Sequence, residues 1–178
     1  MNLKNITLMA LTASCLLQVG AQLFAVSIVA STLSEAPPRS FAMLQGEYGY
    51  NSSSFWDIVP SITFLLFIIA LITNWKTQRQ KLILFALALF IFAGVAAAFL
   101  LEPFFAEIIK KGFSDRVDSA LHAQAKRWYM FDWMVWSLGL VAGLTLLVAL
   151  TRPLRLFNTQ LPKILINLNL QVKSFIDN

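Results

Sequence analysis

Four long apolar stretches without a charged residue constrain this chain more than any other feature. They cover residues 6–33, 58–74, 82–101 and 133–151. About 20 apolar residues suffice to cross the hydrocarbon core of a bilayer as a helix, and the first stretch is long enough to tilt or to overhang the membrane. The pattern predicts an all-α fold, an integral membrane four-helix antiparallel bundle over residues 1–151, followed by a cytoplasmic tail over 152–178.

The composition excludes an ordinary soluble domain. Hydrophobic residues make up 58% of the chain and charged residues only 13%, whereas soluble domains carry about 25% charged residues. A single cysteine, Cys15, excludes a disulfide within the chain, and a single histidine, His122, excludes a multi-histidine metal site. We therefore expect neither a metal nor a cofactor.

The first apolar stretch has a second interpretation as a cleaved signal peptide. Lys4 would be its charged start, and small residues at 30–32 would precede the cleavage site. The apolar core of a signal peptide usually measures about 7–15 residues, and this stretch is far longer. The length favours a retained membrane span.

All five tryptophans fall at the ends of predicted spans, where indole rings favour the headgroup region of a bilayer. They are Trp56, Trp75, Trp128, Trp133 and Trp136. The N-terminus, the 74–81 connection and the tail carry eight Lys and Arg, against six in the other two connections. This excess predicts that both termini are cytoplasmic in a bacterial inner membrane. The net charge of +5 then faces anionic lipid, and no nucleic-acid partner is indicated.

Three segments outside the spans are predicted to be helical. A short interfacial helix is expected around 39–47. In the second outer connection, Ser114 is expected to cap a helix that runs into the fourth span, with His122 paired to Asp118 four residues earlier. The tail is expected to form an amphipathic helix on the cytoplasmic leaflet, or alternatively a partner-binding helix.

Polar residues inside or at the ends of spans predict a ligand pocket, because such residues are costly in a membrane. The pocket would open outward and would be lined by Gln18, Gln22, Asp57, Glu102, Asp132 and Trp136. In the alternative interpretation, the three carboxylates reach water at the interface and the glutamines bond across helices. No charge lies at the centre of a span, and Pro60 is expected at a helix entrance, which argues against a pump or a transporter.

Gly139 and Gly143 form a small-residue motif on the fourth span. Small residues allow the backbones of two membrane helices to approach closely. The motif favours packing within one bundle and leaves open a homodimer formed through Gly139 and Gly143.

Several short motifs resemble the anthrone oxygenase-like family of four-helix membrane proteins, most of which have no known function. They are Ser54-Phe55-Trp56, Asn74-Trp75 and the LHAQAKRWYMFDW sequence at 121–133. The resemblance covers roughly residues 20–150 and implies the fold and a membrane location. Family members commonly follow a tryptophan with a histidine and then an arginine. Here Trp128 matches, but Asp132 and Val135 stand at the other two positions.

Two functions follow from these observations. The first is a bundle that binds a lipid or an apolar small molecule, or that supports a membrane protein partner. The alternative, which the resemblance implies, is a cofactor-independent oxidoreductase acting on an apolar aromatic or quinone-like substrate. Asp132, Glu102 and Trp128 would then be the candidate catalytic residues, with a carboxylate as general base. Whether the chain is an enzyme stays open at this point.

Overall fold

A computed structural model describes residues 2–153 of the chain. The predicted tail helix lies outside them from residue 154 on. The described helices are α1 (Leu3–Phe24), the π-helix η1 (Ala25–Ala30), α2 (Ser31–Glu35), the 3-10 helix η2 (Arg39–Leu44), α3 (Ser53–Thr73), α4 (Gln80–Ala96), the π-helix η3 (Ala97–Leu101), α5 (Glu102–Ile109) and α6 (Ser119–Thr151). No β-strand occurs within residues 2–153.

Four continuous helical segments of the described chain are long and apolar enough to cross a membrane. They are Leu3–Glu35, Ser53–Thr73, Gln80–Ile109 and Ser119–Thr151. Their number and positions confirm the all-helical fold with four long apolar helices. The third extends beyond its predicted span through α5, and the fourth begins at Ser119, which confirms the predicted helix that runs into this span. Ile108 and Leu121, which lie in these extensions, are buried in the core.

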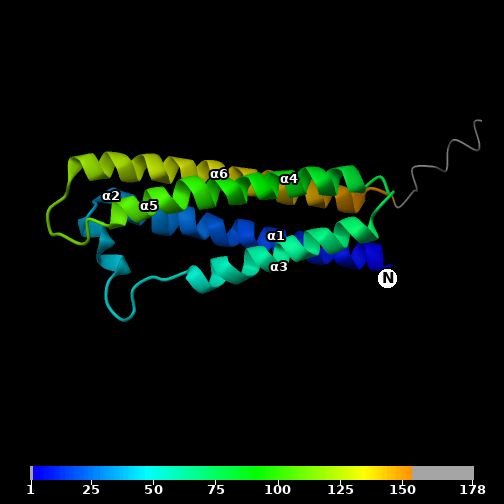
Figure 1. Cartoon of the computed structure of the whole chain (residues 1–178), viewed down its shortest axis with the longest axis horizontal. Coiled ribbons are helices and arrows are strands. Elements are labelled where there is room, and N and C mark those ends of the chain that lie inside the picture. The colour runs from blue at the N-terminus through cyan, green and yellow to red at the C-terminus, as the bar shows by residue number, and fades with distance from the viewer. Residues whose placement is uncertain (1, 154–178) are drawn as a thin grey trace, which may run out of the picture.

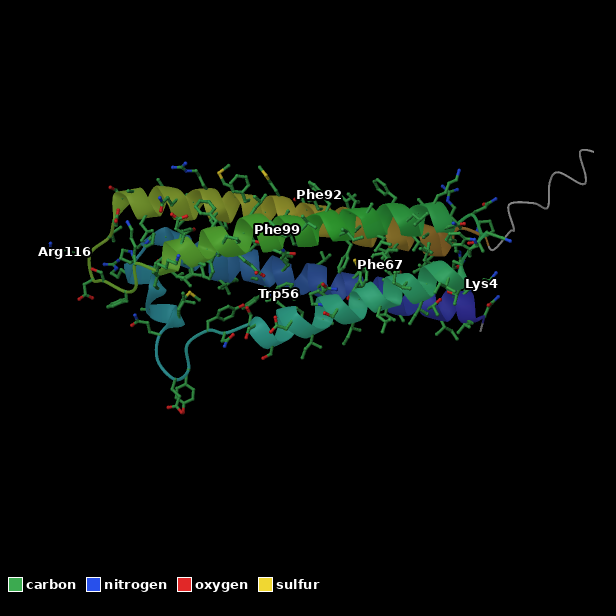
Figure 2. All side chains as sticks on the ribbon, viewed as in Figure 1. Lys4, Trp56, Phe67, Phe92, Phe99 and Arg116 are labelled. Atoms are coloured by element: carbon green, nitrogen blue, oxygen red, sulfur yellow. The ribbon has the colours of Figure 1, made fainter. Side chains whose placement is uncertain are left out.

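Different segments of the chain lie at the two ends of the molecule. The N-terminus, the turn between α3 and α4, and the end of α6 lie at one end, here called the Arg79 end (Figure 1). Helix η2 and the 110–118 loop lie at the other, the loop end. There the backbone N–H of Asp118 donates to the carbonyl of Pro37 over 3.0 Å. Figure 2 shows Lys4 at the first end and Arg116 at the second, with labelled phenylalanines between them.

The helices share two clusters of buried apolar side chains, and α6 packs against both α1 and α4. The cluster nearer the Arg79 end contains Leu8, Leu11, Cys15, Phe67, Ala70, Ile83, Ala86, Ala142, Leu146 and Ala149. The cluster nearer the loop end contains Val29, Ala30, Leu33, Phe41, Ala93, Leu101, Ile108, Leu121, Ala125, Trp128 and Val135. Helix α1 contributes to the first cluster and its extension through η1 and α2 to the second.

The small-residue motif of α6 lies against α1 in the same chain. A Cβ atom built on Gly143 would lie 2.9 Å from Cδ2 of Leu16, and one on Gly139 would lie 3.7 Å from Cγ2 of Val19. These distances show that α1 and α6 approach closely at the glycines. The predicted packing within one bundle is confirmed, and a homodimer stays a prediction.

Helix α3 packs against the bundle only along its second half. Its buried residues are Thr63, Phe67 and Ala70, all of which follow Pro60. The prediction that Pro60 stands at a helix entrance was wrong, because α3 already begins at Ser53. Proline has no N–H for the carbonyl four residues earlier, so this turn of α3 lacks one intrahelical hydrogen bond.

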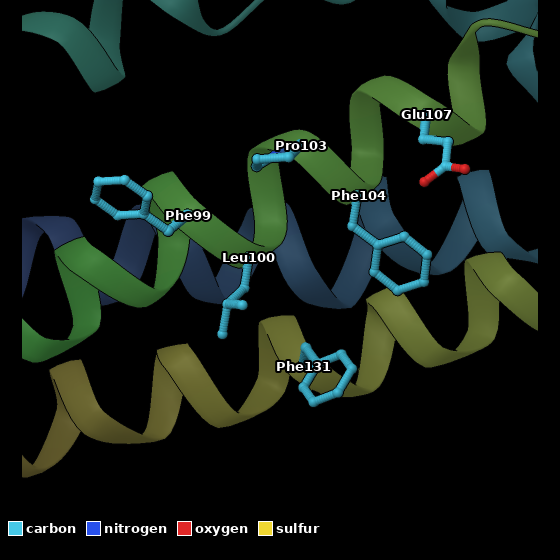
Figure 3. A pocket seen from close by; sticks show the side chains of 6 residues that line it. All are labelled: Phe99, Leu100, Pro103, Phe104, Glu107 and Phe131. Atoms are coloured by element: carbon cyan, nitrogen blue, oxygen red, sulfur yellow. The ribbon is translucent and has the colours of Figure 1, made fainter.

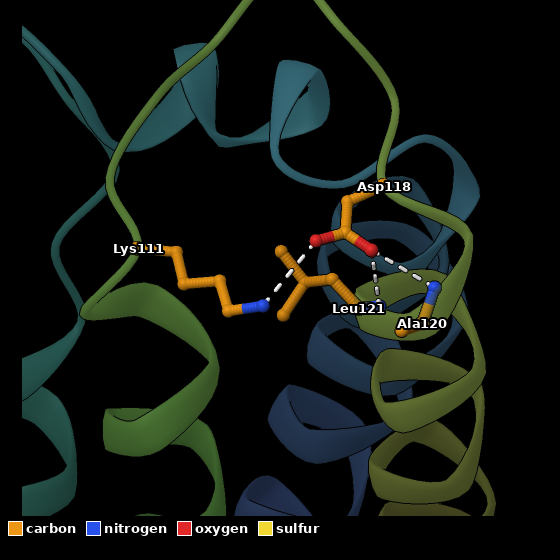
Figure 4. Close-up of polar contacts among 4 residues, drawn as sticks. All are labelled: Lys111, Asp118, Ala120 and Leu121. Atoms are coloured by element: carbon orange, nitrogen blue, oxygen red, sulfur yellow. Dashed lines mark hydrogen bonds and ion pairs between the residues drawn. The ribbon is translucent and has the colours of Figure 1, made fainter.

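The start of α6 differs from the sequence prediction. The N-cap is Asp118 and not Ser114, since the Asp118 carboxylate accepts from the N–H of Ala120 at 2.9 Å and of Leu121 at 3.1 Å. Its other oxygen binds Lys111 Nζ at 3.3 Å (Figure 4). The predicted side-chain pair with His122 is therefore wrong. As an N-cap the carboxylate turns toward the free amides of the first turn.

The connection between α2 and α3 fits its prediction more closely than the start of α6 does. The short helix expected around 39–47 is present as η2, which ends at Leu44. The ring of Phe41 is buried in the cluster nearer the loop end. An apolar side chain from the connection thus closes this end of the core.

Candidate functional site

Asp132 is the most deeply placed carboxylate of the predicted site. Its side chain projects from the middle of α6 into the bundle and is only 9% exposed. Gln22, on the last turn of α1, donates from Nε2 to Asp132 Oδ1 over 3.3 Å. Within residues 2–153 no Lys, Arg or His lies within ion-pair distance of this carboxylate. Asp132 is thus a buried acceptor with one long amide hydrogen bond.

Trp128 precedes Asp132 by one helical turn and lies on the same face of α6. The sequence places it at the membrane interface, but the structure buries it in the core at 9% exposure. Its ring stacks on Phe105 of α5 with 4.8 Å between the ring centroids. The indole N–H is buried and has no hydrogen-bond partner among the described residues.

The indole N–H of Trp136 is already paired within the bundle. Its indole N–H donates to the carbonyl of Val19 over 3.2 Å and so ties α6 to α1. Its ring also meets Trp133 edge to face, with centroids 5.3 Å apart. A donor already used in this way is not available for a ligand.

Gln18 and Gln22 lie on one face of α1 but reach different helices. The Gln18 amide donates to the hydroxyl of Thr63 on α3. Thr63 also exchanges a hydrogen bond with Ser14 over 2.6 Å, and its hydroxyl donates to the carbonyl of Val59 over 2.9 Å. Gln18 therefore belongs to a polar cluster between α1 and α3, separate from Asp132.

Asp57 and Glu102 lie on the outer surface of the bundle. Both side chains are exposed, and neither makes a side-chain hydrogen bond within the described part of the chain. The structure thus brings together Gln22 and Asp132, with Trp128 and Trp136 one turn away on either side in α6. Gln18, Asp57 and Glu102 lie apart from this pair. Nowhere in residues 2–153 do three His, Cys, Asp or Glu side chains come close enough to hold a metal ion.

A groove on the outer surface of the bundle is absent from the sequence prediction. It has a volume of about 350 Å³ and opens on the side of the bundle between η3, α5 and α6 (Figure 3). Its lining residues are Phe99, Leu100, Pro103, Phe104, Glu107 and Phe131. We call it the Phe104 groove. Its apolar residues are indistinguishable in sequence from ordinary lipid-facing ones, because the groove depends on how two helices rotate toward each other.

A buried arginine cluster at the Arg79 end is a second feature that sequence reasoning missed. The Arg79 guanidinium is 5% exposed. It donates from Nη1 to Asn5 Oδ1 over 2.7 Å, from Nε to the carbonyl of Arg152 over 2.8 Å, and from Nη2 to that of Leu150 over 3.3 Å. Burial lowers the pKa of Arg79, although an arginine stays charged in proteins. This cation offsets the negative end of the α6 dipole.

Comparisons with protein-family models, with curated proteins and with solved structures found no match for this chain. The oxidoreductase hypothesis and its candidates Asp132, Glu102 and Trp128 therefore stay predictions. The site itself is a buried Asp132–Gln22 pair with an unpaired Trp128 N–H one turn away, and the apolar groove lies on the outside of the bundle.

Proposed function

We propose that this chain is an integral membrane protein that binds a lipid or another apolar small molecule in the Phe104 groove. It spans the bacterial inner membrane as an antiparallel four-helix bundle, with the Arg79 end in the cytoplasm and the loop end outside. Helix α1 is retained as a span, since Leu8 and Leu11 form part of the core.

The exposed apolar surface supports the membrane location. Phe92 is 61% exposed and Phe99 is 75% exposed, and both lie on the third long helix, between the two ends (Figure 2). Soluble monomers rarely expose large continuous apolar patches. A hydrocarbon surrounding removes the cost of exposing such rings to water.

The groove is the observation that carries the binding function. Its volume of about 350 Å³ falls within the range of about 300–1,000 Å³ that is usual for small-molecule sites. Three phenylalanines, a leucine and a proline supply an apolar lining, and Glu107 adds a carboxylate toward the loop end. A ligand with an apolar body and a polar group at one end matches this order of side chains.

Native mass spectrometry of the detergent-purified protein tests this function. We expect the wild type to retain a small apolar molecule. Leu100→Trp fills the groove and should abolish retention. Leu84→Trp is the matched control, because Leu84 is an exposed leucine on the same long helix outside the groove.

Two results would overturn the proposal. One is a wild-type protein that is always recovered empty. The other is equal retention by Leu100→Trp and Leu84→Trp. Recovery of an empty bundle together with another membrane protein would instead favour the partner-supporting role.

A further inference from the structure

We propose that the Phe104 groove binds a bilayer lipid whose head group ends in an ammonium. This inference rests on the proposed binding function and adds the chemical class of the ligand. The ammonium lies at the head-group site, which consists of Phe104, Glu107 and Phe131, and the acyl chain follows the apolar lining toward Phe99. An unpaired carboxylate, two aromatic rings and the position of the groove along the third long helix lead to this class.

The first observation is the free carboxylate of Glu107. Of the six residues that line the groove, Glu107 is the only charged one. Its side chain is exposed and makes no ion pair or side-chain hydrogen bond within residues 2–153. An ionised carboxylate only accepts hydrogen bonds. It is therefore available to a cationic head group, and it repels an anionic one.

The second observation is a pair of aromatic rings beside this carboxylate. Phe104 precedes Glu107 by three residues, so the two side chains share a face of α5. Figure 3 shows both on the side of α5 that faces α6, from which Phe131 reaches into the groove. A cation is attracted to the face of an aromatic ring and forms stronger hydrogen bonds with a carboxylate than a neutral hydroxyl does. Rings and carboxylate together thus favour an ammonium.

The third observation is where the groove lies along the proposed membrane span. The predicted third span ends at residue 101, so Phe99 and Leu100 lie inside it, and Phe104 and Glu107 lie beyond it. A helix rises about 1.5 Å per residue, which places Glu107 roughly 9 Å beyond residue 101. Polar head groups begin where the hydrocarbon core ends. One lipid can therefore have its acyl chain and its head group in the same groove.

Native mass spectrometry of the full chain with a lipid mixture tests this site. The probe is an equimolar mixture of phosphatidylethanolamine and phosphatidylglycerol with identical acyl chains. Both lipids carry the same phosphate diester, and only the first ends in an ammonium. We expect the wild type to retain the ethanolamine lipid about fivefold more than the glycerol lipid, the ratio that one exposed ion pair and one cation–π contact together supply.

Two matched pairs of variants separate the head-group site from the rest of the surface. Glu107→Gln should abolish the preference, whereas Glu102→Gln should keep it, because Glu102 is an exposed carboxylate of the same helix outside the groove. Phe104→Leu removes a ring from an apolar lining and should lower the preference about twofold or more. Phe92→Leu, at an exposed ring outside the groove, should leave it unchanged. Thermal unfolding in detergent shows whether each variant is folded.

The outcomes distinguish this inference from the proposed function. Equal retention of the two lipids, lost in Leu100→Trp, would overturn the head-group site and leave the groove intact. A preference that survives in Glu107→Gln, or that falls equally in Glu102→Gln, would come from the general surface charge and would also overturn the site. An unchanged preference in Phe104→Leu would overturn the role of the rings. Recovery of the wild type without either lipid would overturn the groove and the head-group site together.

Discussion

At the scale of single residues, the Arg79 end depends on one side chain. Arg79 joins the start of α1, through Asn5, to the last carbonyls of α6. The planar guanidinium reaches three acceptors in different directions, which a lysine ammonium on a flexible stem does not reproduce. The sequence shows only the positive charge of Arg79, which entered the predicted orientation but gives no information on these contacts.

Arg79→Lys should therefore destabilise the bundle although the charge is kept. Hydrogen bonds to charged groups contribute about 1.5–3 kcal/mol each, and we expect a loss of about that size. Arg152→Lys is the matched control, because the Arg152 side chain is exposed and makes no hydrogen bond within the described residues. Thermal unfolding in detergent measures both. Equal unfolding temperatures for the two variants would contradict the role of Arg79.

Gly143 is a second residue on which the packing of the bundle depends, because it allows α6 to lie close to Leu16 of α1. Gly143→Ala brings a methyl group to 2.9 Å from Cδ2 of Leu16. Overpacking usually lowers the free energy of unfolding by about 1–3 kcal/mol. We expect a loss of about 1 kcal/mol here, because the end of a leucine side chain can move. Gly94→Ala is the control, since nothing lies within 4 Å of its added Cβ, and there helix propensity favours alanine.

A double variant tests whether the cost comes from that contact. Leu16→Ala should remove most of the penalty of Gly143→Ala, as expected for residues that touch. Additive losses in the double variant would point to another cause.

At the scale of elements, the ends of the helices deviate most from the sequence prediction. Apolar runs locate helices that are long and apolar enough to cross a membrane, and the four long helices were predictable for that reason. They give no signal for the extension Glu102–Ile109. The sequence did predict a helix that runs into the fourth span, and it missed only the N-cap, which is Asp118 and not Ser114. Ile108 and Leu121 of these two segments share a buried cluster with Phe41 of η2, and α6 is capped by Asp118.

The cap at Asp118 makes the start of α6 sensitive to acid. The N–H of Leu121 and then the side chain of Lys111 lower the pKa of this carboxyl below its ordinary value. A group with a lowered folded pKa stabilises the fold above its unfolded pKa, about 3.9 for aspartate, and loses that effect as the pH falls through the folded value. Asp118→Ala should thus lower the unfolding temperature at pH 7, and the difference from wild type should shrink in acid below the folded pKa.

Asp115→Ala is the control for this measurement. Asp115 is an exposed carboxylate three residues earlier, and it makes no side-chain hydrogen bond within the described residues. Its removal should leave the unfolding temperature unchanged at either pH. A difference for Asp118→Ala that is equally large in neutral and acid solution would show that the carboxylate charge has no part in the cap.

At the scale of the whole molecule, the sequence predicts which residues share an end but not which of them touch. The spans put Gln22, Asp57, Glu102 and Asp132 toward the loop end, yet only Gln22 and Asp132 meet. Contact depends on the rotation of each helix about its axis, which the close approach of α1 and α6 at Gly143 helps to set. The Phe104 groove and the unpaired N–H of Trp128 arise from the same rotations, so sequence periodicity alone gives no access to them.

The proposed orientation of the bundle gives the last prediction. Cys15 is the single cysteine of the chain and is buried, so Cys15→Ala gives a cysteine-free background. Ser114→Cys then places a thiol at the loop end and Gln78→Cys at the Arg79 end, both at exposed positions. A membrane-impermeant maleimide added to intact bacteria should label only Ser114→Cys, and Gln78→Cys should react after permeabilisation. Labelling in the reverse order would place the Arg79 end outside and would overturn the proposed orientation. The excess of basic residues at that end would then not have held it in the cytoplasm.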